Sequence, residues 1–144
     1  MYPFPLDLPV VPGSDGAGEV VEVGSKVSLF KKGDRVTTLF NQQHQYGPID
    51  PLAANSGLGG VVDGTLRQYG VFNENGLVQS PKNLNDLESS SLTCAALTSW
   101  NALYGLKPLL PGQVVLVQGT GGVSMFALQV WSSQSLTSSS EPLI

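Results

Sequence analysis

The residues best suited to chemistry form a glycine-rich turn near the C-terminal end of the chain, Gly119-Thr-Gly-Gly-Val-Ser124. The apolar residues 114–117 predict a buried strand before the turn, and residues 125–131 predict the start of a helix after it. Glycine lets the backbone approach a pyrophosphate closely, and a helix N-terminus offers free N–H groups and the positive end of its dipole. We predict that the turn binds the phosphates of a dinucleotide, the alternative being an ordinary tight connection between strand and helix. The predicted contacts are Gly119, Gly121, Gly122, Val123 and Ser124.

Composition narrows the classes of protein to which the chain can belong. Its 144 residues suffice for one domain with a sizeable core. Charged residues make up only 12% and the net charge is -4, so we expect neither nucleic acid nor a membrane surface as a partner. The 17 Gly and 10 Pro, together with 41% hydrophobic residues, favour an ordered, turn-rich protein with much β-structure.

The single cysteine, Cys94, excludes an intrachain disulfide and points to a reducing compartment. No apolar run approaches the ~20 residues of a membrane-spanning helix. The N-terminus lacks the basic and apolar regions of a signal peptide. We therefore expect a cytoplasmic protein.

Short apolar segments between turn residues predict a small β domain in the first half of the chain. Residues 19–24 and 35–40 are predicted strands, with a further short apolar run at 27–30, and residues 66–72 and 77–79 are predicted to form a hairpin. The polar, Gly- and Pro-rich stretch 41–60 is predicted to be a long surface loop without an element of its own.

A helix is predicted over residues 89–106, with Asn85 or Asp86 as its N-cap. Apolar residues follow helical spacing at Leu92, Ala95, Ala96, Trp100 and Leu103. The serine-rich stretch 132–140 is a poor continuation of any helix. The order of elements predicts a mixed α/β chain, in which a small β domain over residues 1–88 precedes the beginning of an α/β domain over residues 89–144.

Several sequence blocks carry a resemblance to a known family. Residues 12–24, which read PGSDGAGEVVEVG, are followed by FKKGDRV at 30–36, LTSWNAL at 97–103 and PGQVVLVQGTGGVS at 111–124. These blocks occur in the order of the medium-chain dehydrogenase/reductase superfamily, and the chain resembles its zinc-independent branch of quinone-reductase-like and alcohol-dehydrogenase-like proteins.

The resemblance implies a fold and an activity. The fold would be an incomplete GroES-like β barrel followed by the first strand-turn-helix of a Rossmann domain. The activity would be hydride transfer between NAD(P)H and a carbonyl compound, a quinone or an activated alkene. Because the family pattern extends beyond the matched residues at both ends, we expect a truncated and inactive fragment, with an exposed seam that favours homo-oligomers or aggregates. A non-catalytic GroES-like interaction module or pseudoenzyme is the alternative.

The resemblance also suggests site residues outside the glycine turn. Ser14 and Asp15 would line the substrate pocket, unless Gly13 and Gly16 merely shape a turn in which Asp15 accepts backbone hydrogen bonds. Thr98 would contact the ribose or amide of the nicotinamide, unless its hydroxyl bonds back to a helix carbonyl. No catalytic residue is assigned.

A zinc site is not expected. Zinc-containing relatives carry His-Glu where this chain has Ser14 and Asp15, and serine is a poor zinc ligand. Cys94 falls where such relatives place a last catalytic ligand, but one thiolate cannot hold the metal, so we expect a small buried structural residue there. His44, the only histidine, is predicted to be a solvated loop residue.

Overall fold

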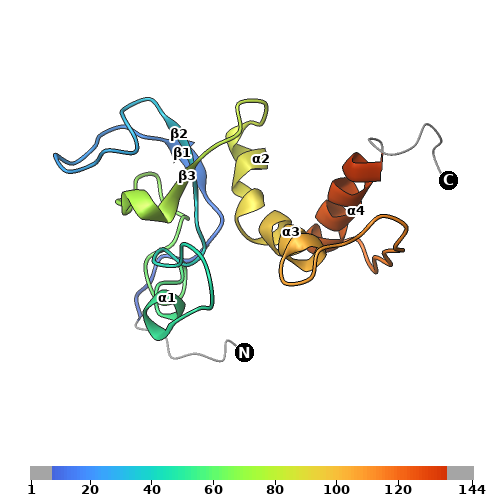
Figure 1. The fold of residues 1–144 in the computed structure, drawn as a ribbon. Helices are drawn as coiled ribbons and strands as arrows, with labels where there is room; N and C mark the ends of the chain where they lie inside the picture. The colour runs from blue at the N-terminus through green and yellow to red at the C-terminus, as the bar shows by residue number, and fades with distance from the viewer. Residues whose placement is uncertain (1–7, 136–144) are drawn as a thin grey trace. The chain divides into compact units, whose positions relative to one another are not determined.

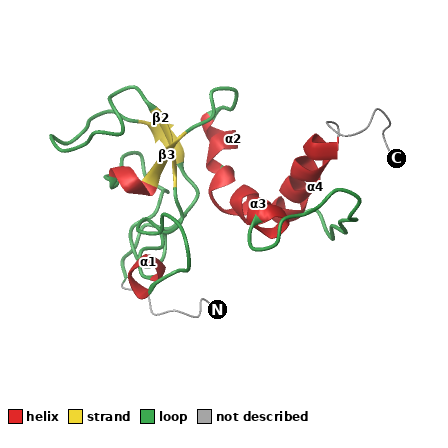
Figure 2. Cartoon of the chain, viewed as in Figure 1, coloured by secondary structure: helices red, strands yellow, loops and turns green. Residues whose placement is uncertain are grey.

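The computed structural model describes residues 8–135 of the chain. These residues divide into two compact units, with the boundary between Thr93 and Cys94 (Figure 1). Strands occur in the first unit, whereas the regular structure described in the second unit is helical (Figure 2).

The first unit is built on a small antiparallel sheet. Its strands are β1 (Ala17–Glu19), β2 (Arg35–Thr38) and β3 (Leu77–Gln79), in the order β1-β2-β3. The residue pairs Gly18–Val36 and Val36–Gln79 fix the register. The β-branched residues of β2 are buried between the two neighbouring strands, which is the environment that favours them. The predicted strands at 35–40 and 77–79 are confirmed, although both are short.

The expected strand at 19–24 is wrong in its position, because β1 ends at Glu19. Val20, the next residue, is linked to the residues just before β2 by two backbone hydrogen bonds. Its N–H donates to the carbonyl oxygen of Asp34 at 2.9 Å, and its carbonyl oxygen accepts the N–H of Gly33 at 2.8 Å. The apolar run 27–30 forms no strand. The N–H groups of Ser28 and Leu29 donate to the Glu74 carboxylate at 2.9 and 2.8 Å, so a side chain satisfies the donors that a partner strand would bind.

The predicted hairpin is also wrong, since residues 66–72 form no strand. Asn73 caps a 3₁₀-helix, η1 (Glu74–Gly76), by accepting the N–H of Asn75 at 2.9 Å. That turn directs β3 onto β2 instead of back along residues 66–72.

The stretch 41–60 contains a short helix that the sequence did not predict, α1 (Pro51–Ala54). Asp50 caps it by accepting the N–H of Ala53 at 2.7 Å, and proline occupies the first helical position, where its missing N–H costs nothing. Ala53, Ser56 and Leu58 are buried, so this stretch contributes part of the core of the first unit.

The predicted helix start is confirmed, with Asn85 as the N-cap of α2 (Asp86–Ser90). The Asn85 carboxamide accepts the N–H of Glu88, and the Glu88 carboxylate accepts the N–H of Asn85, both at 2.9 Å. This reciprocal capping box satisfies two donors of the first turn. Asp86 pairs with Arg35 of β2 and so fastens the helix to the sheet.

The single helix predicted over 89–106 is interrupted. α2 ends at Ser90, a π-helical segment η2 (Leu92–Ala96) follows, and α3 (Leu97–Tyr104) completes the run. The predicted apolar face is buried only in part, because Leu103 is buried whereas Trp100 is 51% exposed. The extra residue of a π-turn rotates the following side chains, which changes the face that the helical spacing predicted.

The last described helix is α4 (Gly122–Ser135), so the predicted helix start at 125–131 is confirmed. Contrary to the prediction, the helix continues through Ser135, while residues 136–140 lie outside the described residues. No described helix is both long and apolar enough to cross a membrane.

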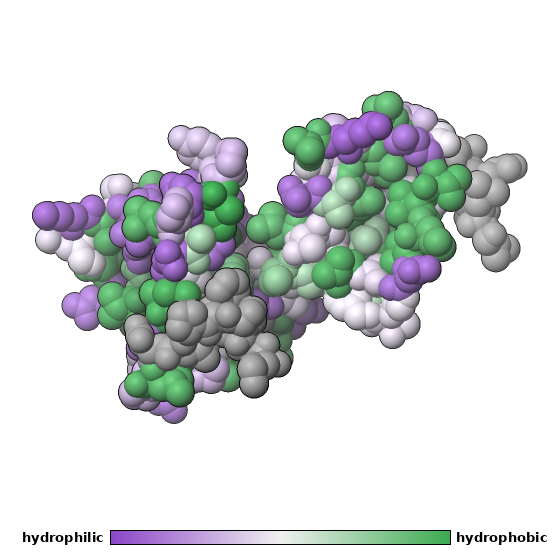
Figure 3. Space-filling view, turned by 90° about the horizontal axis from the view of Figure 1, so that it is seen from below, coloured by the Kyte–Doolittle hydropathy of each residue, from purple (hydrophilic) through white to green (hydrophobic). Residues whose placement is uncertain are grey.

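The predicted buried strand at 114–117 is not formed. Val114 is 93% exposed and Leu116 is 81% exposed, and no described residue pairs with this segment. A parallel strand is buried only when neighbouring strands and helices cover it, and the described part of the second unit supplies no such strand. Apolar residues accordingly make up much of the visible face of this unit (Figure 3).

Candidate functional site

In the turn before α4, the three glycines Gly119, Gly121 and Gly122 differ in backbone conformation and in the space around them. Gly119 has φ +83°, a conformation that side chains disfavour. A Cβ at Gly122 would lie 3.1 Å from the Cβ of Ala95, so glycine lets α4 pack closely on η2. A Cβ at Gly119 or Gly121 would meet no heavy atom within 4 Å. The turn is therefore packed on one side and open to a ligand on the other.

Two serine hydroxyls hold this turn. Ser124 Oγ donates to the carbonyl oxygen of Gln118 at 2.7 Å, which closes the turn across its own ends. Ser99 Oγ lies 2.6 Å from the carbonyl oxygen of Val123 and 2.8 Å from that of Ala95, so it bridges α4 and the preceding turn of its own helix. The Ser124 hydroxyl already has an acceptor, so backbone N–H groups remain the donors open to a phosphate.

The electrostatics at the start of α4 favour an anion. The first N–H groups of a helix have no intrahelical partner. At this helix, the N–H of Met125 donates to the carbonyl oxygen of Gly121, four residues earlier, at 3.0 Å. The first turn carries no acidic side chain. The sequence has no Asp or Glu between Glu88 and Glu141, so the described residues of the second unit contain no carboxylate side chain that would offset the positive end of the dipole.

Thr98, on α3 in the same unit, is exposed and its hydroxyl makes no hydrogen bond within the described residues. The bond back to a helix carbonyl, which was the alternative for Thr98, is made instead by its neighbour Ser99. Sequence reasoning missed Ser99, which is fully buried. The only signal in the sequence was a serine in the middle of the helix predicted over 89–106.

Ser14 and Asp15 belong to the first unit. They directly follow Gly13, whose backbone is crossed closely by the backbone at Gly59 and Gly64. A Cβ at Gly59 would lie 2.6 Å from the nitrogen of Gly13, and a Cβ at Gly64 would lie 2.0 Å from its carbonyl oxygen. Side chains at these positions would prevent the crossing, which places the 13–16 turn against residues 59–64.

Two threonine hydroxyls anchor the backbone of this turn. Thr38 Oγ1 donates to the carbonyl oxygen of Ser14 at 2.9 Å, and Thr65 Oγ1 donates to that of Asp15 at 3.0 Å. The Ser14 hydroxyl in turn donates to the Asp15 carboxylate at 2.7 Å. Asp15 therefore engages a side chain rather than backbone N–H groups, and it remains exposed.

The residues considered for metal binding are dispersed. Within residues 8–135, no three of the His, Cys, Asp and Glu side chains lie close enough together to hold a metal ion. Cys94 is exposed, so the expectation of a buried structural cysteine was wrong. It follows the buried Thr93 in the π-helical segment, where a small shift of the helical face decides which side chain is covered. His44 is half-buried and its Nε2 lies 3.0 Å from the carbonyl oxygen of Gly47, so it braces its loop rather than only facing solvent.

Two carboxyl groups of the first unit have shifted pKa values. The backbone N–H groups of Leu29 and Ser28 lower the pKa of Glu74 by hydrogen bonding to its carboxylate. The Lys31 side chain and backbone lower the pKa of Asp34 in the same manner. Both carboxylates hold loops beside the sheet and lie outside the predicted site.

Comparison with known proteins agrees with this picture. The alcohol dehydrogenase GroES-like domain matches residues 2–82. A zinc-type alcohol dehydrogenase-like protein of Schizosaccharomyces pombe is 50% identical over 131 residues, which cover 90% of this chain and 38% of that protein. A chloroplastic quinone-oxidoreductase homolog of Spinacia oleracea is 33% identical over 88% of this chain and 35% of its own length.

The solved structures lead to the same family. The crystal structure of a putative alcohol dehydrogenase from Sinorhizobium meliloti 1021 has a TM-score of 0.82 and 40% identity, over 91% of this chain and 39% of that one. The chain thus spans about two fifths of the length of the relatives it matches. These matches confirm the resemblance to the superfamily and the mixed α/β fold class with a GroES-like domain. The chain belongs to the alcohol dehydrogenase GroES-like domain family, within the medium-chain dehydrogenase/reductase superfamily.

Proposed function

We propose that the chain is part of an NAD(P)-dependent oxidoreductase that transfers hydride between a nicotinamide and a carbonyl compound, a quinone or an activated alkene. Its relatives include alcohol dehydrogenases and quinone oxidoreductases, which supports this class of reaction. The glycine turn before α4 is the observation that carries the proposal. It combines a positive-φ glycine, open space and unpaired helix N–H groups, which together suit a pyrophosphate.

The residues of the turn fit a dinucleotide by their backbone rather than by their side chains. The N–H groups of Gly121, Gly122, Val123 and Ser124 would donate hydrogen bonds to the phosphate oxygens, and Gly119 would let the phosphates approach the backbone. Thr98 would donate or accept at the nicotinamide ribose or amide through its free hydroxyl. When bound, the nicotinamide supplies the hydride. The work of the protein is then to orient it against the substrate and to exclude water.

Ser14 and Asp15 are proposed to line the substrate pocket. Their backbone is fixed by Thr38 and Thr65, so side chains there would present a constant geometry to a substrate. Because the Ser14 hydroxyl donates its hydrogen bond to the Asp15 carboxylate, its oxygen is left as an acceptor for a substrate hydroxyl.

We propose that this function does not require zinc. Serine at position 14 supplies neither thiolate, imidazole nor carboxylate, and Cys94 alone would be a single ligand. Elemental analysis of undialysed protein is expected to find far less than one zinc per chain. About one zinc per chain, lost in Cys94→Ala, would contradict the proposal.

The organisation and location follow from the same reasoning. Residues 1–88 are proposed to form the GroES-like β domain, and residues 89–144 the linking helix and the start of a Rossmann nucleotide-binding domain. A single cysteine and an acidic, weakly charged composition support a cytoplasmic location.

Titration with NADPH and NADH, followed by the fluorescence of Trp100 and Trp131, tests the cofactor site. A complete dinucleotide site with micromolar affinity has a binding free energy of about 8 kcal/mol. The chain spans about two fifths of the length of its relatives, so we expect it to make fewer hydrogen bonds to the dinucleotide than a complete site does. The absence of three ordinary hydrogen bonds, of about 1 kcal/mol each, would weaken binding roughly a hundredfold. We therefore expect weak binding and no turnover by the 144-residue chain.

Gly121→Asp sharpens this test, because the site has room for the side chain while the new carboxylate would repel a pyrophosphate. Gly24→Asp is the matched control, since a Cβ there meets nothing closer than 4.0 Å. Loss of binding in Gly121→Asp alone supports the proposal. Equal titration curves for both variants would overturn it, and no response of the unmodified chain to millimolar dinucleotide would favour a non-catalytic interaction module.

A further inference from the structure

The two arginines of the chain differ in how their guanidinium groups are paired. Arg35 donates from Nε and Nη2 to the Asp86 carboxylate at 2.9 and 2.5 Å. The Nε of Arg67 is buried and has no hydrogen-bond partner, and its Nη1 lies 3.8 Å from Asp63 Oδ2, beyond hydrogen-bonding distance. Arg67 is therefore a cation with unused donors.

Its surroundings hold Arg67 in place without supplying an acceptor. The guanidinium carbon lies 5.2 Å from the centre of the Phe72 ring, so the cation rests on an aromatic face. A Cβ at Gly70 would lie 2.8 Å from Arg67 Nε, so the Gly70 backbone lies close to this buried nitrogen. The Asp63 carboxylate is engaged elsewhere, since its Oδ1 accepts the N–H of Val11 at 2.9 Å. The Nη groups make no hydrogen bond within the described residues, so they, rather than the buried Nε, can donate to a ligand that supplies acceptors.

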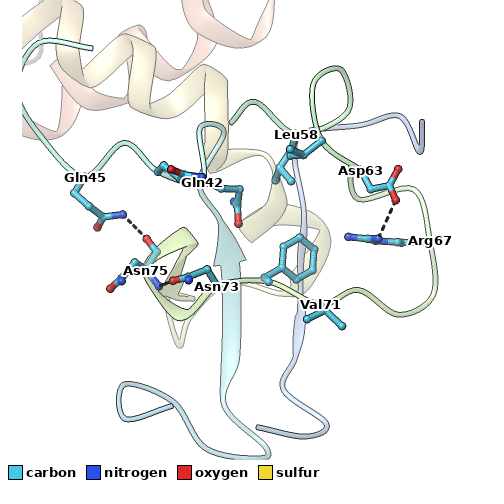
Figure 4. Close-up of a pocket in the computed structure, with 11 residues that line it drawn as sticks. Gln42, Gln45, Leu58, Asp63, Arg67, Val71, Asn73 and Asn75 are labelled. Carbon is cyan, nitrogen blue, oxygen red and sulfur yellow. Dashed lines mark hydrogen bonds and ion pairs between the residues drawn. The ribbon is translucent and has the colours of Figure 1, made fainter. Parts of the chain in front are cut away.

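Arg67 lies at a pocket of about 770 Å³ in the first unit. Figure 4 shows the guanidinium directed into this pocket, with Gln42, Gln45, Asn73 and Asn75 on the other side of the view. The pocket is lined by carboxamides and by apolar side chains, namely Gln42, Gln43, Gln45, Asn73 and Asn75, and Leu58, Val62, Val71 and Phe72.

Several of the carboxamides have donors to spare. Gln42 Nε2 is committed to the carbonyl oxygens of Leu39 and Gly76. In contrast, the side-chain NH₂ groups of Gln43, Asn73 and Asn75 make no hydrogen bond within the described residues. Together with Arg67, these carboxamides give the pocket several unused hydrogen-bond donors. The rest of its wall is apolar in part.

We propose that this pocket binds a small organic carboxylate. The carboxylate receives hydrogen bonds from the Nη groups of Arg67, whose side chain is 26% exposed, and from a neighbouring carboxamide. A short hydrocarbon part lies against Leu58, Val62 and Val71. The nearby Asp63 limits the pocket to weakly charged ligands, so a monocarboxylate is preferred over phosphate. The pocket shares no residue with the glycine turn, and the proposal does not depend on the proposed hydride transfer.

The test uses butanoate at neutral pH and the ¹H–¹⁵N signals of the two arginine Nε–H groups in the 144-residue chain. Butanoate is expected to shift the Arg67 signal with a dissociation constant on the order of 1 mM, while the Arg35 signal, already bonded to Asp86, stays in place. Butanamide, which has nearly the same shape without the charge, should leave both signals unchanged.

Two substitutions that should change butanoate affinity in opposite directions sharpen the test. Arg67→Lys keeps the charge but loses the planar donor pair, so butanoate binding followed at backbone amides near Asn73 should weaken at least about tenfold. Asp63→Asn removes a like charge, so binding should strengthen about fivefold. Arg35→Lys is the matched control and should bind butanoate as the unmodified chain does.

Other outcomes would overturn the proposal. Equal shifts of both arginine signals would indicate a general salt effect. Butanamide binding as well as butanoate, or weaker binding in Asp63→Asn, would indicate a neutral, hydroxyl-bearing ligand. Inorganic phosphate binding more tightly than butanoate would assign the pocket to phosphate groups.

Discussion

Glycines shape both predicted sites, but they do so for opposite reasons. In the first unit, Gly13, Gly59 and Gly64 pack against one another so closely that a Cβ at 59 or 64 would overlap backbone atoms. In the second unit, Gly119 and Gly121 face open space. The comparison teaches that a glycine-rich sequence is no evidence for a ligand unless the space in front of the glycine is empty. By this criterion the turn at 119–124 is suited to a cofactor, whereas the crossing at 13, 59 and 64 supports the loop that carries Ser14 and Asp15.

The largest effect is expected at the closed crossing. Gly64→Ala would place a Cβ 2.0 Å from the carbonyl oxygen of Gly13, and backbone cannot move aside as a side chain can. We expect the free energy of unfolding of the first unit to fall by more than about 3 kcal/mol. Urea denaturation followed by circular dichroism measures it. Gly121→Ala is the matched control at the open turn and should change stability by less than about 0.5 kcal/mol, and equal losses in both variants would break the comparison.

A smaller effect is expected where a buried hydroxyl holds the open turn. Ser99→Ala removes the donor to the carbonyl oxygen of Val123 and should destabilise the second unit by about 1–2 kcal/mol. Thr98→Ala, one residue away and exposed, should leave the unfolding curve unchanged and weaken only dinucleotide binding. A stability loss for Thr98→Ala that matches that of Ser99→Ala would show that position 98 has a structural role.

The two units should also differ in association. Val114 and Leu116 are exposed in an extended segment whose backbone has no partner strand among the described residues, and such segments pair with other chains. We expect sedimentation velocity to show oligomers, and the double substitution Val114→Lys with Leu116→Lys to shift the distribution toward monomer. Substitution of the exposed Val21 and Val23 of the first unit by Lys serves as the control and should have less effect.

The smallest effect concerns pH and is confined to the first unit. The pKa of Glu74 is lowered in the folded chain by the N–H groups of Leu29 and Ser28. Its stabilising contribution is therefore present above the unfolded value of 4.5 and is lost as the pH falls through the lower folded pKa. Thermal unfolding between pH 7 and pH 2 should show this loss, and Glu74→Gln should reduce it. The second unit has no Asp or Glu between Glu88 and Glu141, so an acid transition of the same size in its helices would contradict this assignment.

Elements governed by neighbouring residues were predictable from the sequence. The Asn85 cap, the glycine turn leading into α4 and the strand β2 follow from short-range chemistry, because capping, positive φ and β-branched residues act within a few positions. The family could also be inferred, since its blocks lie in order along the chain. Helix α1 was missed although Asp50 and Pro51 form a recognisable start, because the helix is only four residues long.

Tertiary structure decided the features that depend on contacts between distant residues. Glu74 satisfies Ser28 and Leu29 across more than forty positions, which turns an apolar run into a loop. Segment 114–117 lacks a strand partner in the described chain, so its apolar pattern alone could not bury it. The missing hydrogen-bond partner of Arg67 Nε is likewise invisible in the sequence, where Arg67 and Arg35 are the same residue type. The sequence by itself determined which groups were available, while tertiary structure determined which of them found partners, because hydrogen bonds and packing depend on separation in space rather than along the chain.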